Sequence, residues 1–331
     1  MRYRPAADLR GDEKPILDVV SLGRRGIGRR DHLVVGQIAR AVRRVPEVVI
    51  KVSGGARTPR GFALHLDYIG RNGELEIETD DGKRMREEGF EKKLIEDWDL
   101  DLESYRERPR WIGEQGRKPP KLVHNIIFSM PPGTPPSKLF AAVRKLAESR
   151  FALQHRYAMV LHTDEKHPHV HVVVKSVSEQ GKRLNIRKAT LREWRQDFAR
   201  WLREQGIAAN ATERAVRGQT HKPFKNGIYR AARRGASHFL RNRVVAIGRD
   251  ISSGEFRPDP GRDALQRTRA AVLDGWRAVG DRLTEDGHHD LAAEVRHFAM
   301  RMPRARTERG YIAVELMARV AKSRELESPT R

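Results

Sequence analysis

The stretch HTDEKHPHVHVVV, residues 162–174, holds four of the chain's 13 histidines and then runs into three consecutive valines. A run of β-branched residues predicts a buried β-strand. Side chains alternate between the two faces of a strand, so His169 and His171 lie on the same face, roughly 7 Å apart along the backbone. The alternate valines, Val170, Val172 and Val174, then point to the opposite face and into a core.

A second apolar strand is predicted immediately before this one, over residues 157–161. The residues between His162 and His169 are enough to turn the chain back beside it, which brings three imidazoles onto one sheet face. Neutral imidazole is the commonest metal ligand, and three histidines with an open position suit a catalytic divalent cation, Mg²⁺ or Mn²⁺. His167 is a further candidate ligand, or a residue that contacts a ligand without binding the metal. Asp164 is placed to orient a ligating ring.

Composition indicates a polyanionic partner. The chain has 331 residues, and 66 Lys and Arg against 44 Asp and Glu give a formal net charge of +22. Such an excess favours binding to phosphates, while an aromatic content of only 6% argues against a protein that stacks many bases. Cysteine is absent, which excludes disulfides, thiolate nucleophiles and cysteine-rich zinc sites. There is no long apolar run, so we expect a cytoplasmic protein without a membrane segment.

Three regions are predicted along the chain: a basic N-terminal arm at 1–45, an α+β core at 46–206 and a basic helical region at 207–331. The core is expected to be an antiparallel sheet flanked by helices. Its strands are predicted at 47–53, 74–79 (exposed), 122–130, 157–161, 170–176 and 184–186. One helix is predicted at 86–110, a second begins at Ser137, and a third begins at a capping box formed by Thr190. Residues 61–69 fit both a strand and a helix. The remaining helices are predicted at 34–42, 228–246, 262–283, 289–301 and 308–322, and a flexible Gly-Arg cluster at 24–30.

Tyr68 is a candidate nucleophile. Without cysteine, covalent chemistry is left to Ser, Thr, Tyr or Lys, or water attacks instead. Tyr68 follows an apolar face and precedes the turn sequence at 70–73, which places its hydroxyl at the rim of an element. A core tyrosine at the end of an element fits the same pattern, so the residues alone leave both readings open.

Three motifs, taken in order, resemble the relaxase/mobilization nuclease family. They are FALHLDYIGRNG at 62–73, FSMPPGT at 128–134 and HTDEKHPHVH at 162–171. This family includes plasmid Mob proteins and the T-DNA border endonuclease, and it belongs to the wider group of HUH endonucleases. The resemblance covers roughly residues 46–206.

The resemblance implies a metal-dependent, site- and strand-specific nick in single-stranded DNA at a plasmid or mobile-element transfer origin. It implies that Tyr68 is the nucleophile, left joined to the 5′ phosphate, and that its segment is helical. Asp164 would orient a ligand or assist deprotonation of the tyrosine. The metal ligands that it implies are His162, His169 and His171, and the candidate DNA contacts are Ser129, Arg71 and Lys175.

Conjugative transfer is the context that the resemblance implies. The partners would be single-stranded origin DNA with its adjoining duplex, accessory origin-binding proteins and a type IV secretion coupling protein, with export of the chain on the transferred DNA. Two alternatives stay open from the sequence. One is another HUH enzyme, a replication initiator or transposase. The other is a non-enzymatic DNA-binding protein whose histidines hold a structural metal or none.

Overall fold

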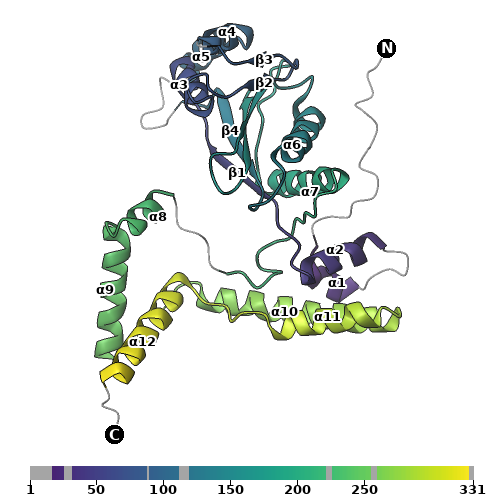
Figure 1. The fold of residues 1–331 in the computed structure, drawn as a ribbon, viewed down its shortest axis with the longest axis vertical. Helices are drawn as coiled ribbons and strands as arrows, with labels where there is room; N and C mark the ends of the chain where they lie inside the picture. The colour runs from purple at the N-terminus through teal and green to yellow at the C-terminus, as the bar shows by residue number, and fades with distance from the viewer. Residues whose placement is uncertain are drawn as a thin grey trace. The chain divides into compact units, whose positions relative to one another are not determined.

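Figure 1 draws the computed structural model, which describes residues 17–25, 32–87, 89–111, 119–220, 226–254 and 259–327. The chain divides into two compact units, one formed by residues 44–211 and the other by residues 1–43 together with 212–331. The first unit contains the three motifs.

The unit at 44–211 is built on one antiparallel sheet. Among the described residues its strands are β1 (Val49–Gly54), β2 (Ile77–Thr79), β3 (Arg84–Met85), β4 (Val123–Ser129), β5 (Tyr157–His162) and β6 (His169–Lys175). The strand order is β1-β4-β6-β5-β2-β3, and every pairing is antiparallel. The predicted α+β class with an antiparallel sheet is confirmed. β6 lies between β4 and β5, and this central place explains its almost continuous run of valines.

Helices cover both faces of the sheet (Figure 1). On one face α6 (Pro136–Phe151) and α7 (Lys188–Glu204) share a core with the alternate valines of β6. On the other face α3 (Pro59–Ile69), α4 (Phe90–Asp97) and α5 (Leu100–Trp111) enclose a second core. The histidines of β5 and β6 lie on this second face, at the end where those strands meet.

α3 resolves the ambiguity of residues 61–69 in favour of a helix. Thr58 caps its first turn by accepting a hydrogen bond from the backbone N–H of Gly61 at 3.1 Å, and Pro59 occupies the first turn. The buried residues follow helical spacing: Phe62, Leu66 and Ile69. The strand-like alternation around them arises because Leu64 and Tyr68 are exposed and lie outside this buried stripe.

Three local predictions were wrong. Residues 74–79 were expected to form an exposed strand, but β2 is buried because it pairs with β5 as well as β3. No strand forms at 184–186. The preceding residue, Arg183, makes an isolated bridge with Val177, and the N–H of Leu184 donates to the carbonyl of Ser176 at 2.7 Å. α7 begins at Lys188, before the start that a capping box at Thr190 predicts. Thr190 lies inside the first turn, where its hydroxyl accepts a hydrogen bond from the backbone N–H of Arg187.

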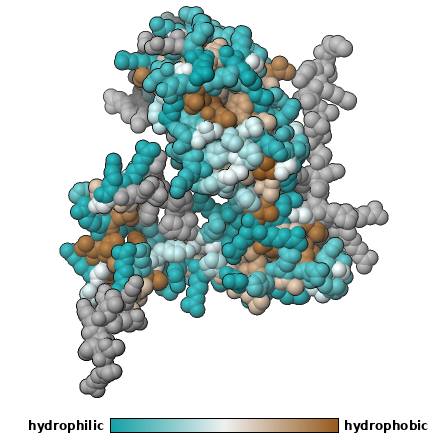
Figure 2. All heavy atoms as spheres, in the orientation of Figure 1, coloured by the Kyte–Doolittle hydropathy of each residue, from teal (hydrophilic) through white to brown (hydrophobic). Residues whose placement is uncertain are grey.

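The second unit is helical. Its elements are α1 (Val19–Arg25), α2 (His32–Val42), α8 (Asn226–Arg233), α9 (His238–Ser253), α10 (Arg262–Glu285), α11 (His289–Met300) and α12 (Glu308–Glu327). The single helix predicted at 228–246 is two helices, because Gly235 adopts a left-handed φ of 68° and Ser237 caps α9. The face drawn in Figure 2 is mostly hydrophilic, with a hydrophobic patch over α9. The exposed apolar residues of α9 include Phe239, Val244 and Val245.

The N-terminal helices pack with the C-terminal ones. α1, α2, α10 and α11 bury one common apolar core around Trp276, whose Nε1 donates to the carbonyl of Val216 at 2.9 Å. This differs from the expected separate arm, because the apolar sides of α1 and α2 are buried only against other helices. The Gly-Arg cluster at 24–30 lies mostly outside the described residues. The predicted boundaries after residues 45 and 206 stay a prediction of where the nuclease domain begins and ends.

Gly275→Ala tests this packing. A Cβ at Gly275 of α10 would lie 2.5 Å from the carbonyl oxygen of Val19, so we expect α1 to be pushed away and the unit to lose about 1–3 kcal/mol of unfolding free energy. Gly248→Ala in α9 is the matched control, since a Cβ there meets nothing within 4 Å and the change only improves helix propensity. Thermal unfolding followed by circular dichroism gives both values. Equal melting temperatures for the two variants would contradict the contact.

Candidate metal centre and nucleophile

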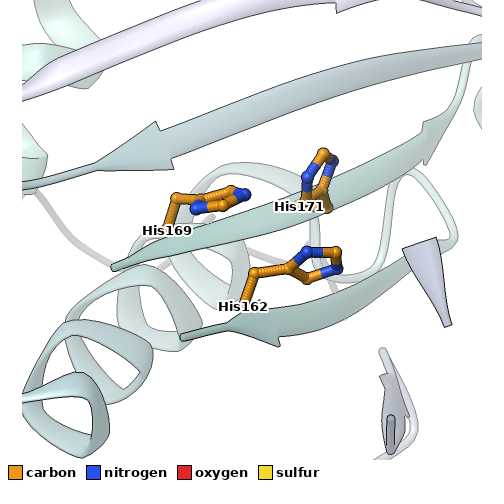
Figure 3. A group of neighbouring side chains, drawn as sticks. All are labelled: His162, His169 and His171. Carbon is orange, nitrogen blue, oxygen red and sulfur yellow. The ribbon is translucent and has the colours of Figure 1, made fainter. Parts of the chain in front are cut away.

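Three imidazoles converge where β5 and β6 meet (Figure 3). His162 lies directly opposite His169 in the β5–β6 register, and His171 is opposite Val160. The ring centroids are 4.6–5.1 Å apart, and one ligand atom from each residue lies within 4.8 Å of the others. The structure therefore brings together the three ligands expected from the sequence.

Hydrogen bonds fix the tautomers of two of these rings. Nε2 of His162 lies 2.7 Å from the carbonyl oxygen of Ile69, and Nδ1 of His169 lies 3.1 Å from that of His167. A carbonyl oxygen only accepts, so each of these ring nitrogens carries the proton. Nδ1 of His162 and Nε2 of His169 are then left with lone pairs, as metal ligands require.

The surroundings favour the neutral form of His162 and His171. Burial lowers the pKa of His162, and burial followed by the charges of His162 and His169 lowers the pKa of His171 to about 3. Neutral imidazole is the form that binds metals. In addition, Oδ1 of Asp164 lies 3.7 Å from Nδ1 of His162, so two atoms that bear lone pairs face each other. A cation stabilises such an arrangement, and the residues present fit a divalent ion.

Tyr68 lies in the last turn of α3, next to Ile69, whose carbonyl holds His162. Its side chain is 61% exposed. The guanidinium carbon of Arg71 lies 5.6 Å from the centroid of the tyrosine ring, and Arg71 Nη2 is 2.5 Å from Oδ2 of Asp164. A chain of contacts thus leads from Tyr68 through Arg71 and Asp164 to His162.

The ion pair between Arg71 and Asp164 keeps both groups charged. The hydrogen bond to Asp164 raises the pKa of Arg71. Desolvation acts to raise the pKa of Asp164, but the hydrogen bond from Arg71, a backbone hydrogen bond and the charge of Arg71 together lower the pKa of this carboxyl. Asp164 is therefore a carboxylate at neutral pH.

The turn after Tyr68 is strained. Arg71 and Asn72 both have a φ of 53°, a left-handed conformation that costs a non-glycine residue roughly 1 kcal/mol. Two hydrogen bonds of 2.9 Å hold the turn, from the N–H of Asn72 to the carbonyl of Asp67 and from that of Leu75 to Gly70. The turn folds Arg71 back over the tyrosine ring, and strain of this kind collects at functional sites.

The other predicted site residues lie in different places. Ser129 on β4 pairs with His169, so it faces the same side of the sheet beside the site. His167 is outside the group of three: its side chain is exposed, and only its carbonyl supports His169. Lys175 lies at the opposite end of β6, is 4% exposed and pairs with Glu179 at 3.3 Å. The structure does not bring Lys175 to the site.

Sequence reasoning gave no role to His65. It lies on α3 one turn before Tyr68, and its ring centroid is 6.4 Å from that of His171. The signal that could have found it is the spacing of three between His65 and Tyr68, which places both on one side of a helix. That signal depends on α3 being a helix, which the sequence pattern left open.

The sequence of this unit matches a family of known proteins. Residues 76–207 match the family model described as "Relaxase: MobA/VirD2-like, nuclease domain". This part of the chain is similar to the nuclease domain of relaxases. The match includes Ser129 and the three histidines but begins after Tyr68.

Curated relatives include the T-DNA border endonucleases VirD2 of Agrobacterium fabrum, Rhizobium rhizogenes and Rhizobium radiobacter. The identities are 27% over 222 residues, 26% over 217 and 26% over 213. These matches cover 57–59% of this chain and 46–47% of each relative, so the chain spans about half the length of the curated relatives it matches. No solved structure matches the chain significantly. Among the described helices, none combines the length and apolarity needed to cross a membrane.

Proposed function

We propose that this chain is a DNA relaxase that nicks one strand at a specific site in a plasmid or mobile-element transfer origin, for conjugative DNA transfer. The reaction would depend on a divalent metal, Mg²⁺ or Mn²⁺, and pass through a covalent 5′-phosphotyrosine at Tyr68. The observation that carries the proposal is the hydrogen bond from His162 to the carbonyl of Ile69. It ties the three histidines to the helical turn that presents an exposed tyrosine.

In the proposed reaction the Tyr68 hydroxyl oxygen attacks the scissile phosphorus. The bond from this oxygen to phosphorus forms as the bond to the 3′ oxygen breaks, the phenol loses its proton, and the leaving 3′ oxygen takes one up. The 5′ phosphate stays on the tyrosine. Rejoining reverses these steps and needs no nucleotide cofactor, because the phosphotyrosine ester retains the bond energy.

His162, His169 and His171 would hold the metal ion. When bound, a divalent cation polarises the scissile phosphate and stabilises the charge that develops on it. Arg71 would position the phenol through its contact with the ring, while Asp164 anchors Arg71. The planar guanidinium is also suited to bind phosphate oxygens.

DNA is the substrate that the charge supports. An excess of 22 positive charges attracts phosphates regardless of base sequence, so binding is expected to weaken steeply with salt. Ser129 and Arg71 are the residues that we propose for contacts near the nick. The burial and ion pair of Lys175 argue against a contact by that residue. Accessory origin-binding proteins and a type IV secretion coupling protein stay predictions.

The proposal is tested by covalent capture. The full chain is incubated with labelled single strands that tile the transfer origin of its replicon, with Mn²⁺ or with EDTA, and resolved on a denaturing gel. We expect one strand to give a protein–DNA adduct that forms with Mn²⁺ and is absent with EDTA. Binding without cleavage under all conditions would favour a DNA-binding protein instead.

Arg71→Ala tests the positioning of the phenol. We expect nicking to slow by about 10²-fold, the cost of a small misplacement of a reacting group, while Mn²⁺ affinity stays unchanged. Arg60→Ala is the control for the loss of one positive charge, since Arg60 is exposed in the first turn of the same helix. Single-turnover nicking rates are measured for both variants. Equal rates would show that Arg71 contributes only a positive charge and does not position the phenol.

A further inference from the structure

In each of the three histidines, one ring nitrogen would bind the metal and the other is free to make a hydrogen bond. The three residues differ in whether this second nitrogen has a partner. A histidine that binds a metal through one nitrogen almost always donates its other N–H to an acceptor. His162 and His169 do so, to the carbonyls of Ile69 and His167. Nδ1 of His171 is buried and has no hydrogen-bond partner among the described residues. One of the three ligands therefore lacks the contact that would fix its ring.

His65 is the neighbour that can supply it. The rings of His65 and His171 are 6.4 Å apart between centroids and meet edge to face at 63°. Nε2 of His65 is also buried and without a partner among the described residues. Two buried nitrogens that need hydrogen bonds thus belong to adjacent rings.

The spacing fits one bridging water. A ring nitrogen lies about 1 Å from its centroid, so the two nitrogens come no closer than roughly 4 Å, beyond a direct bond of about 3 Å. A water between them makes two bonds of ordinary length, and a bridge of this kind is nearly as favourable as a direct hydrogen bond.

We infer that His65 is a positioning residue for His171. The two imidazoles share a bridging water, which places the proton of His171 on Nδ1 and leaves its Nε2 for the metal ion. This inference rests on the proposed metal site and assigns the residue that holds its third ligand.

The inference gives α3 a larger part in the site. His65, Tyr68 and Ile69 are spaced at three and four along the helix, so they share one side of it. Through His65 and the carbonyl of Ile69, this helix orients two of the three ligands and also carries the nucleophile. A displacement of α3 would then move the metal ion and the phenol together, which preserves their separation.

The test compares three variants of the full chain. His65→Leu keeps a similar volume but removes both nitrogens, whereas His65→Gln restores polar atoms in the same place. The matched control is His124→Leu, which removes another partly buried imidazole whose Nδ1 is buried and unpaired, from β4 on the face that packs with α6 and α7. Mn²⁺ is titrated into metal-free protein by calorimetry, and the His171 tautomer is read in metal-free protein by ¹⁵N NMR.

We expect His65→Leu to weaken Mn²⁺ binding by 10–100-fold, the usual cost of losing a residue behind a ligand, and to abolish the preference for Nδ1–H on His171. His65→Gln should recover most of the affinity, and His124→Leu should behave as wild type. Wild-type affinity and tautomer in His65→Leu would overturn the inference, as would an equal loss in His124→Leu. Absence of Mn²⁺ binding by the wild-type chain would instead overturn the metal site itself.

Discussion

Tyr68→Phe is expected to abolish both nicking and strand transfer, with no covalent adduct, while the chain still folds and still binds Mn²⁺ and DNA. The substitution deletes the attacking oxygen and keeps the ring under Arg71. Because the side chain is 61% exposed at the end of α3, loss of the hydroxyl leaves no buried partner unsatisfied. Activity falls to the background of the assay, the largest effect expected of a single atom in this chain.

Tyr105→Phe is the matched control. Tyr105 is also an exposed tyrosine on a helix, 72% accessible in α5, and its loss should change nothing. Tyr157 is unsuited to attack, since it is buried and burial raises its pKa. Peptide sequencing of the adduct by mass spectrometry identifies the modified residue. Attachment at Tyr105 or Tyr157, or cleavage by Tyr68→Phe, would replace this mechanism with another nucleophile.

The part of the site that the sequence predicted depends on local periodicity. The valines of β6 require a buried strand, a buried strand fixes the faces of His169 and His171, and a short loop allows β5 to pair with them. Each step involves only neighbours in the chain. The convergence of the three histidines could be predicted because they come from two adjacent strands.

Contacts between distant segments could not be predicted in the same way. The bond between His162 and Ile69 spans 93 residues, and the ion pair between Arg71 and Asp164 also spans 93. His65 was missed because its role depends on how α3 lies on the sheet. Lys175 was predicted as a DNA contact, but it ends β6, and the length of the strand separates it from the histidines at the other end.

Burial and long-range packing account for the other errors. β2 has the polar composition of an exposed strand, yet Glu78 is buried because Arg144 of α6 pairs with it at 2.5 Å. The N-terminal segment was predicted to be a basic arm because of its Gly-Arg cluster at 24–30. The apolar residues of α1 and α2 share a core with α10 and α11, which lie more than 200 residues further along the chain.

His169→Ala and His171→Ala are each expected to abolish metal-dependent nicking while most of the DNA affinity remains. Each removes one of three ligands to a single ion, so the loss of Mn²⁺ affinity should exceed the 10–100-fold cost of changing a residue behind a ligand. DNA affinity depends on basic residues spread over the chain, which these substitutions leave in place. Calorimetric titration of Mn²⁺ and a DNA-binding assay at fixed salt measure the two quantities separately.

His167→Ala is the control that separates the ligands from their surroundings. His167 belongs to the same short motif, but its side chain is exposed and only its backbone carbonyl contacts His169, and alanine keeps that carbonyl. We expect wild-type Mn²⁺ binding and nicking from this variant. If His169→Ala and His171→Ala bind Mn²⁺ as the wild type does, the three rings are not ligands. The imidazoles would then be packed against one another for another reason, and the lone pairs that His162 and Asp164 direct at each other would need a proton between them in place of a metal ion.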